Sequence, residues 1–162
     1  MKQMMILLGL VFLAAGCHAQ ESVRATLEAN TNRVGWFVIH VTNISSNTVR
    51  FLDIREGTGW CGEFYEITVE KDGKQYKSEG NCLYATGDIP KVVKLLPGKT
   101  YDRNIQPVAY VRSEKHIIPS CDIKVTYRLT EKIRTMWKDK DNKVDLDLRF
   151  ETNKAKIESS NK

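Results

Sequence analysis

Ile123-Lys124-Val125-Thr126-Tyr127-Arg128-Leu129-Thr130 is the stretch of the chain that decides the fold. Apolar and polar side chains alternate along it, and this period of two predicts a β-strand with one buried and one exposed face. A second alternation occupies residues 144–150 and is the expected partner strand. Between the two, Ile133, Met136 and Trp137 either share one side of a helical turn or continue the hairpin.

Strand patterns also fill most of the chain upstream. Residues 23–29 alternate in the same way, whereas residues 34–41 are almost all apolar, as expected for a central strand covered on both faces. Residues 48–54 form the next predicted strand, and the polar turn at 43–47 predicts that these two strands pair in antiparallel fashion. The remaining strands are expected at residues 64–70, around Tyr76, at 92–96 and at 101–105.

Two turns carry strong local signals. Asp72-Gly73 lies between two strand patterns and favours a type I′ turn, whose central residues both have positive φ. Pro97-Gly98 suits a type II turn, in which proline precedes a glycine at positive φ.

Eight or nine short strands with turns between them and no long helix predict an all-β fold, an antiparallel Ig-like or fibronectin-III-like β-sandwich. The sandwich domain is expected to occupy residues 20–152, and residues 153–162 are expected to form a polar tail. A chain of this length suits one domain, with a core large enough to fold without a structural metal.

Four short motifs stand out along the chain: Val41-Thr42-Asn43-Ile44-Ser45-Ser46-Asn47, Lys71-Asp72-Gly73-Lys74, Leu96-Pro97-Gly98-Lys99 and Ile123-Lys124-Val125-Thr126-Tyr127. They resemble the N-x-S turn, the D-G-K hairpin, the L-x-P-G turn and the late strand ending in tyrosine that recur in bacterial exported Ig-like domains of the lipoprotein type. The chain departs from antibody-type domains, because Trp36 does not lie between paired cysteines. The resemblance implies an architecture and no particular function.

The N-terminus has the layout of a bacterial export signal. Lys2 precedes an apolar run that closes on Gly16-Cys17, and the run is shorter than the roughly 20 residues that a spanning helix needs. Residues 13–17 resemble a lipobox, which predicts lipidation at Cys17 after removal of the signal, although Ala14 stands where leucine is usual. A rival cut follows Ala19. Residues 1–19 are therefore the predicted signal region, and the protein is expected at the periplasmic face of the outer membrane as a lipoprotein, or as a soluble periplasmic or secreted protein if cut after Ala19.

Three cysteines remain once Cys17 is set aside. An oxidising compartment favours a disulfide, and the preferred pair is Cys61–Cys82, because both lie in loop sequences that flank the predicted hairpin. Closing a loop of about 20 residues would stabilise the fold by roughly 3 kcal/mol. Cys121 would then be a free thiol, buried at the start of a strand. The pairs Cys61–Cys121 and Cys82–Cys121 stay open alternatives.

Few residues suggest catalysis or metal binding. His116 and Cys121 lie five positions apart. One interpretation is a catalytic thiolate–imidazole pair, and the alternative is a surface histidine and a structural cysteine. His40 lies within a strand, where a hydrogen-bonded role is expected. Ligand spacings and phosphate-binding loops are absent from the sequence, so no catalytic residue, no metal site and no cofactor are predicted. The net charge is +5, and positive and negative residues are interspersed along the chain. This distribution and the predicted export both argue against a nucleic-acid partner.

Aromatic residues in the cysteine-bearing loops suggest a binding surface. The predicted ligand-binding patch consists of Trp60, Phe64, Leu83 and Tyr84; the alternative is that these side chains cap one end of the sandwich. The expected function is that of a non-catalytic binding or structural module of the cell envelope. Its partner is an envelope protein or glycan, and its only membrane contact is the N-terminal lipid. The alternative is an inhibitor or immunity protein that blocks a secreted hydrolase with a loop at 55–62 or 112–120.

Overall fold

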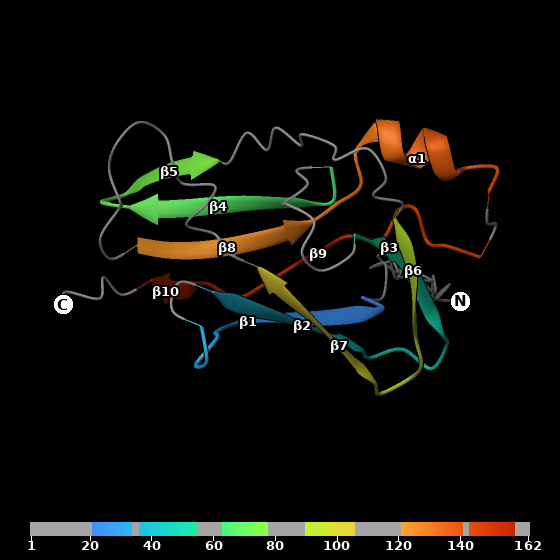
Figure 1. The fold of residues 1–162 in the computed structure, drawn as a ribbon, viewed down its shortest axis with the longest axis horizontal. Coiled ribbons are helices and arrows are strands. Elements are labelled where there is room, and N and C mark those ends of the chain that lie inside the picture. The colour runs from blue at the N-terminus through green and yellow to red at the C-terminus, as the bar shows by residue number, and fades with distance from the viewer. Residues whose placement is uncertain are drawn as a thin grey trace, which may run out of the picture.

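The computed structural model describes residues 21–33, 36–54, 63–77, 90–105, 121–140 and 143–157 (Figure 1). Within these ranges the chain is all-β apart from one short helix, and every strand pairing is antiparallel, which confirms the predicted class. The elements are β1 (Val23–Ala29), β2 (Phe37–Asn43), β3 (Val49–Asp53), β4 (Tyr65–Lys71), β5 (Lys74–Lys77), β6 (Lys91–Leu95), β7 (Thr100–Ile105), β8 (Cys121–Tyr127), α1 (Glu131–Trp137), β9 (Phe150–Glu151) and β10 (Ala155–Ile157).

The strands form three sheets around one hydrophobic cluster. One sheet has the order β1-β2-β7, a second has the order β10-β8-β4-β5 with β9 also on β8, and β3 and β6 form a third. In Figure 1, β9 and β10 run between β8 and the sheet that contains β1. All three sheets and α1 contribute to a single core, in which Tyr65, Tyr127 and Phe51 are the largest fully buried side chains.

The alternating stretch from Ile123 forms β8 as predicted. Its apolar side chains are buried and its polar side chains are half-buried. The segment after it is helical, which confirms one of the two alternatives for that region. Ile133 of α1 is buried while Met136 is 48% exposed, so the two do not share one buried face.

Residues 144–150 are not the partner strand that their alternation predicts. β8 pairs with β4 on one side, and only Phe150–Glu151 of this segment pairs on the other. The reason lies at Asp145, whose N–H donates to the carbonyl of Arg50 and whose Oδ1 accepts the N–H of Asp147 at 3.0 Å. This Asx-type turn breaks the extended backbone. Val144 and Leu148 are buried all the same, so the apolar pattern reports burial without a strand.

The predicted pairing of residues 34–41 with residues 48–54 is also wrong. β2 lies between β1 and β7, and β3 pairs with β6 instead. Asn43 explains the change of sheet, because its buried side chain donates from Nδ2 to the carbonyls of Asn47 and Leu95, both at 2.8 Å. The turn thereby directs the chain into the next sheet. Burial alternates along β2, so this strand is covered on one face and not on both.

Both predicted turns have the expected backbone. Asp72 and Gly73 have φ of 50° and 71°, as a type I′ turn requires. Gly98 has φ of 69°, and the N–H of Lys99 donates to the carbonyl of Leu96 at 3.0 Å, which closes a type II turn.

The ordered sheet continues past residue 152, where the predicted polar tail begins. β10 pairs with β8 from Ala155↔Ile123 to Ile157↔Cys121. Just before it, Asn153 Oδ1 accepts the N–H of Leu27 at 2.7 Å, and Asn153 Nδ2 donates to the carbonyl of Leu27 at 3.2 Å. One polar side chain in this segment therefore links the sheet of β8 to the sheet of β1.

Candidate functional site

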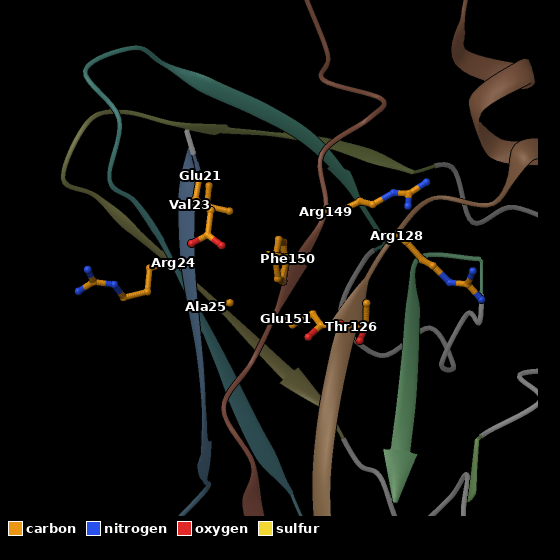
Figure 2. Close-up of a pocket in the computed structure, with 9 residues that line it drawn as sticks. All are labelled: Glu21, Val23, Arg24, Ala25, Thr126, Arg128, Arg149, Phe150 and Glu151. Atoms are coloured by element: carbon orange, nitrogen blue, oxygen red, sulfur yellow. The ribbon is translucent and has the colours of Figure 1, made fainter. Parts of the chain in front are cut away.

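A groove of about 420 Å³ opens between β1 and the paired segments of β8 and β9 (Figure 2). It lies where the edges of two sheets approach each other, and its β1 residues precede Leu27, which bonds Asn153. Its lining consists of Glu21, Val23, Arg24, Ala25, Thr126, Arg128, Arg149, Phe150 and Glu151.

The floor of the groove is apolar. Alternation along β1 turns Val23 and Ala25 toward the core, whereas Arg24 is exposed and points away from them in Figure 2. From the other side comes Phe150, whose ring stacks on that of Tyr127 with centroids 4.7 Å apart and planes at 7°. The stacking holds Phe150 in place, so the groove has a fixed hydrophobic base.

The rim of the groove carries an excess of positive charge. Arg128 Nη2 donates to Glu66 Oε2 at 2.6 Å, and Lys77 Nζ lies 2.9 Å from Glu66 Oε1, so one carboxylate serves two cations. The hydrogen bond from Lys77, with the added charge of Arg128, lowers the pKa of Glu66. Glu151 is paired with Lys124.

Arg149 lies beside Arg128 without a carboxylate of its own. Tyr127 of β8 pairs with Phe150 of β9, so Arg128 and Arg149 are the first residues beyond this pair on the two segments. Among the described residues, neither Arg149 nor Arg24 forms an ion pair. Arg128 is already paired with Glu66, so Arg149 is the arginine left to bind an anionic group at this end of the groove.

A second polar cluster lies inside the core. Asp53 is 0% exposed, and its carboxylate accepts hydrogen bonds from the N–H of Ile54 at 2.8 Å, from Tyr65 at 2.9 Å and from Tyr101 at 2.5 Å. Arg103 Nη1 lies 3.8 Å from Asp53 Oδ2 and donates to the carbonyl of Ile54 at 2.9 Å. Because a buried carboxylate needs such partners, this cluster has a structural role that the scattered sequence positions did not reveal.

Of the predicted ligand-binding patch, the structure describes Phe64 alone. Its side chain is 1% exposed and belongs to the hydrophobic core, so the prediction of a surface role is wrong for this residue. An aromatic side chain directly before β4 completes the core, as the alternative interpretation expected. The other predicted positions lie outside the described residues: Trp60, Leu83, Tyr84, Cys17, Cys61, Cys82, His116 and the loops 55–62 and 112–120.

Cys121 is a free, buried thiol at the first position of β8, as predicted. Burial raises the pKa of this thiol, and the nearby charge of Asp122 adds to the effect. His40 lies on β2 and has the hydrogen-bonded role that was expected, since its Nδ1 lies 2.7 Å from Asp102 Oδ1. Its Nε2 lies 3.8 Å from Glu28 Oε2.

No cluster of three or more metal-binding side chains occurs in the part of the chain that the structure describes. Within the same ranges, no helix is long and apolar enough to cross a bilayer.

The groove was not predicted from the sequence. Its charged residues, Arg24, Arg128 and Arg149, are far apart in the chain, and each falls at an ordinary solvent-facing strand position. Only the register of β9 on β8 brings two of them together. Asp147 and Glu151 flank Arg149 at the i−2 and i+2 positions, so nothing in the sequence showed that these acids pair with Arg134 and Lys124 instead.

The chain matches no model of a known protein family, and a search of curated proteins also finds no match.

Proposed function

We propose that this protein is an exported, non-catalytic binding module of the cell envelope, anchored through lipid on Cys17, and that it binds a protein partner in the groove beside β1. In this proposal its three sheets act together as one Ig-like sandwich. The export signal in the sequence supports the location, and the groove supports the binding role.

The observation that carries the binding role is the combination of an apolar floor with two rim arginines, Arg24 and Arg149, that form no ion pair with any other residue the structure describes. Phe150 and the β1 side chains are buried and give the groove a fixed shape, and Arg149 supplies a charged donor that fixes the orientation of a ligand. Arginine is also enriched in protein interfaces.

The test is site-specific photo-crosslinking in isolated envelopes. A photoreactive residue replaces Glu21 on the groove rim and, as a control, Lys138 after α1, which does not line the groove. We expect a protein adduct of one defined mass from the rim position only. Arg149→Glu should abolish it, whereas Lys94→Glu on β6, which makes the same change in charge, should not.

The same adduct from both positions, an adduct that survives Arg149→Glu, or an adduct with glycan in place of protein would overturn the binding proposal. The anchor is tested separately by intact mass of the membrane-extracted protein. Acyl groups on Cys17 are expected, and an unmodified chain that begins at Gln20 would refute them.

A further inference from the structure

We infer that the end of the fold at which β1 begins rests on an anionic lipid bilayer, with the side chains of Ile44 and Leu96 in its interfacial layer. This inference rests on the proposed lipid anchor. It adds a contact of the protein itself to the lipid, which is the only membrane contact that the sequence predicts. It follows from the exposure of these two side chains, from the short chain that joins them to Cys17 and from the charge around them.

Ile44 and Leu96 are exposed apolar side chains that follow β2 and β6. They are 44% and 47% exposed, whereas most large apolar side chains of the described chain belong to the core. The N–H of Gly98 donates to the carbonyl of Asn43 at 2.9 Å, and the N–H of Asn43 donates to the carbonyl of Lys99 at 3.0 Å. These bonds hold the turn after β2 against the turn between β6 and β7 (Figure 1). The two apolar side chains therefore stand on adjoining turns, where removal from water would be favourable.

The start of the described chain lies beside Ile44. The N–H of Ile44 donates to the carbonyl of Ser22, directly before β1, at 3.1 Å. Five residue steps separate Ser22 from Cys17. Because an extended chain spans at most about 3.6 Å per residue, a lipid on Cys17 keeps Ser22 within about 18 Å of its attachment point. The turn from β1 to β2 lies at the opposite end of the same strands, a further 20 Å or so along β1, at roughly 3.3 Å per residue. The tether therefore favours the end that carries Ile44 as the one that meets the bilayer.

The charge at this end is complementary to anionic lipid. Basic side chains come from β1, β3, β6 and the turn after β6, and they are Arg24, Arg50, Lys94 and Lys99. The acidic residues near them are Glu21, which precedes β1, and Asp145, whose N–H bonds the carbonyl of Arg50, so the balance is positive. None of the four basic side chains forms an ion pair with another described residue. Basic residues around exposed apolar ones are the combination that binds anionic membrane surfaces.

A fluorescent probe tests whether this end meets the bilayer. An environment-sensitive unnatural amino acid replaces Ser46, an exposed residue of the turn that carries Ile44. The lipidated protein is reconstituted in vesicles of phosphatidylethanolamine and phosphatidylglycerol that contain a spin-labelled quencher lipid. The control protein carries the same amino acid at Thr31, an exposed residue of the turn from β1 to β2. We expect the quencher lipid to remove most of the emission from position 46 and none from position 31.

The quenched fraction at position 46 also gives the ratio of docked to undocked protein in each variant. Ile44→Ser should lower this ratio about fivefold, as the burial of roughly half an apolar side chain predicts. Lys99→Ala should lower it about fivefold on these vesicles and leave it unchanged on vesicles of phosphatidylcholine. The matched controls are Met136→Ser on α1, which removes an apolar side chain of 48% exposure, and Lys74→Ala on β5. Both controls should leave the ratio unchanged.

Equal quenching at positions 46 and 31, or no quenching at position 46, would overturn the inference without any variant. A ratio that Ile44→Ser and Lys99→Ala leave unchanged in folded protein would also refute it. Quenching that disappears as the protein is diluted in the vesicles would assign this end to contacts between copies of the chain instead. Acyl groups on Cys17 together with an unquenched probe would leave the anchor standing and refute only the bilayer contact. An unmodified Cys17 would remove the anchor and this inference together, while the groove keeps its own crosslinking test.

Discussion

Replacement of Asn153 by alanine tests how strongly one side chain holds two sheets together. The substitution removes both hydrogen bonds to the backbone of Leu27, at 2.7 and 3.2 Å. Since a hydrogen bond contributes about 1 kcal/mol net, we expect the free energy of unfolding to fall by about 2 kcal/mol. Leu27 is 2% exposed, so water has little access to the groups left behind, and relaxation of the structure will not recover much of this loss.

Asn153→Asp is the matched control, because aspartate keeps an acceptor for the N–H of Leu27 but loses the donor to its carbonyl. We expect a loss of about 1 kcal/mol, half that of the alanine variant. Urea unfolding followed by circular dichroism gives both values, and unchanged m-values would show that the denatured state is unaffected.

An alanine variant within about 0.5 kcal/mol of the parent protein would refute the argument, because that is the range of ordinary surface substitutions. It would mean that β9 and β10 are held by β8 alone and that the contact with β1 adds nothing to stability.

Three further predictions concern the core. Asp53→Asn leaves Arg103 without its buried counter-charge, and we expect the free energy of unfolding in urea to fall by about 3 to 5 kcal/mol. Arg103→Met in the same chain should restore part of this stability, and additive losses would contradict the pairing. Burial raises the pKa of Tyr65 and Tyr127, so the unfolded chain ionises first, and stability that is complete below about pH 10 should fall above it by roughly 1.4 kcal/mol per pH unit for each tyrosine. A urea midpoint that stays constant from about pH 9 to about pH 11 would refute this effect. The Cys121 thiol should resist alkylation in the native protein and react in denaturant without reductant. The two cysteines of the predicted disulfide should stay unlabelled under the same conditions. Rapid labelling of Cys121 in the native protein would contradict its burial.

Local signals were reliable guides to the fold wherever geometry depends on a few neighbouring residues. The bounds of β1 agree with the alternation of its side chains, and the turns at Asp72 and Gly98 have the backbone that their sequences favour. Pairing partners were not predictable in this way, because they depend on distant contacts. The hydrogen bond from Asn43 to the carbonyl of Leu95 is such a contact, and it separates β2 from β3.

The groove was beyond the reach of the sequence for a related reason. Residues 152–154 are polar and lack any strand pattern, yet Thr152 Oγ1 accepts the N–H of Val125 at 3.0 Å and replaces a ladder bond. Asn153 does the same for β1. Side chains that act as substitutes for backbone leave no periodic signal, so residues 152–154, which directly follow the groove residues Phe150 and Glu151 and link the two sheets, look like a tail.

The contact of Asn153 with β1 has a consequence for folding order. Leu27, its partner, lies 126 residues earlier, so this contact closes a long loop. A polypeptide that emerges N-terminus first, from a ribosome or a secretion channel, therefore stays open along β8 until residues 150–157 are free. Synthesis that stops before Phe150 leaves that edge bare, and a bare edge is a template for aggregation. The arrival of residues 150–157, more than any early step, decides when β8 gains its neighbours and the two sheets are joined.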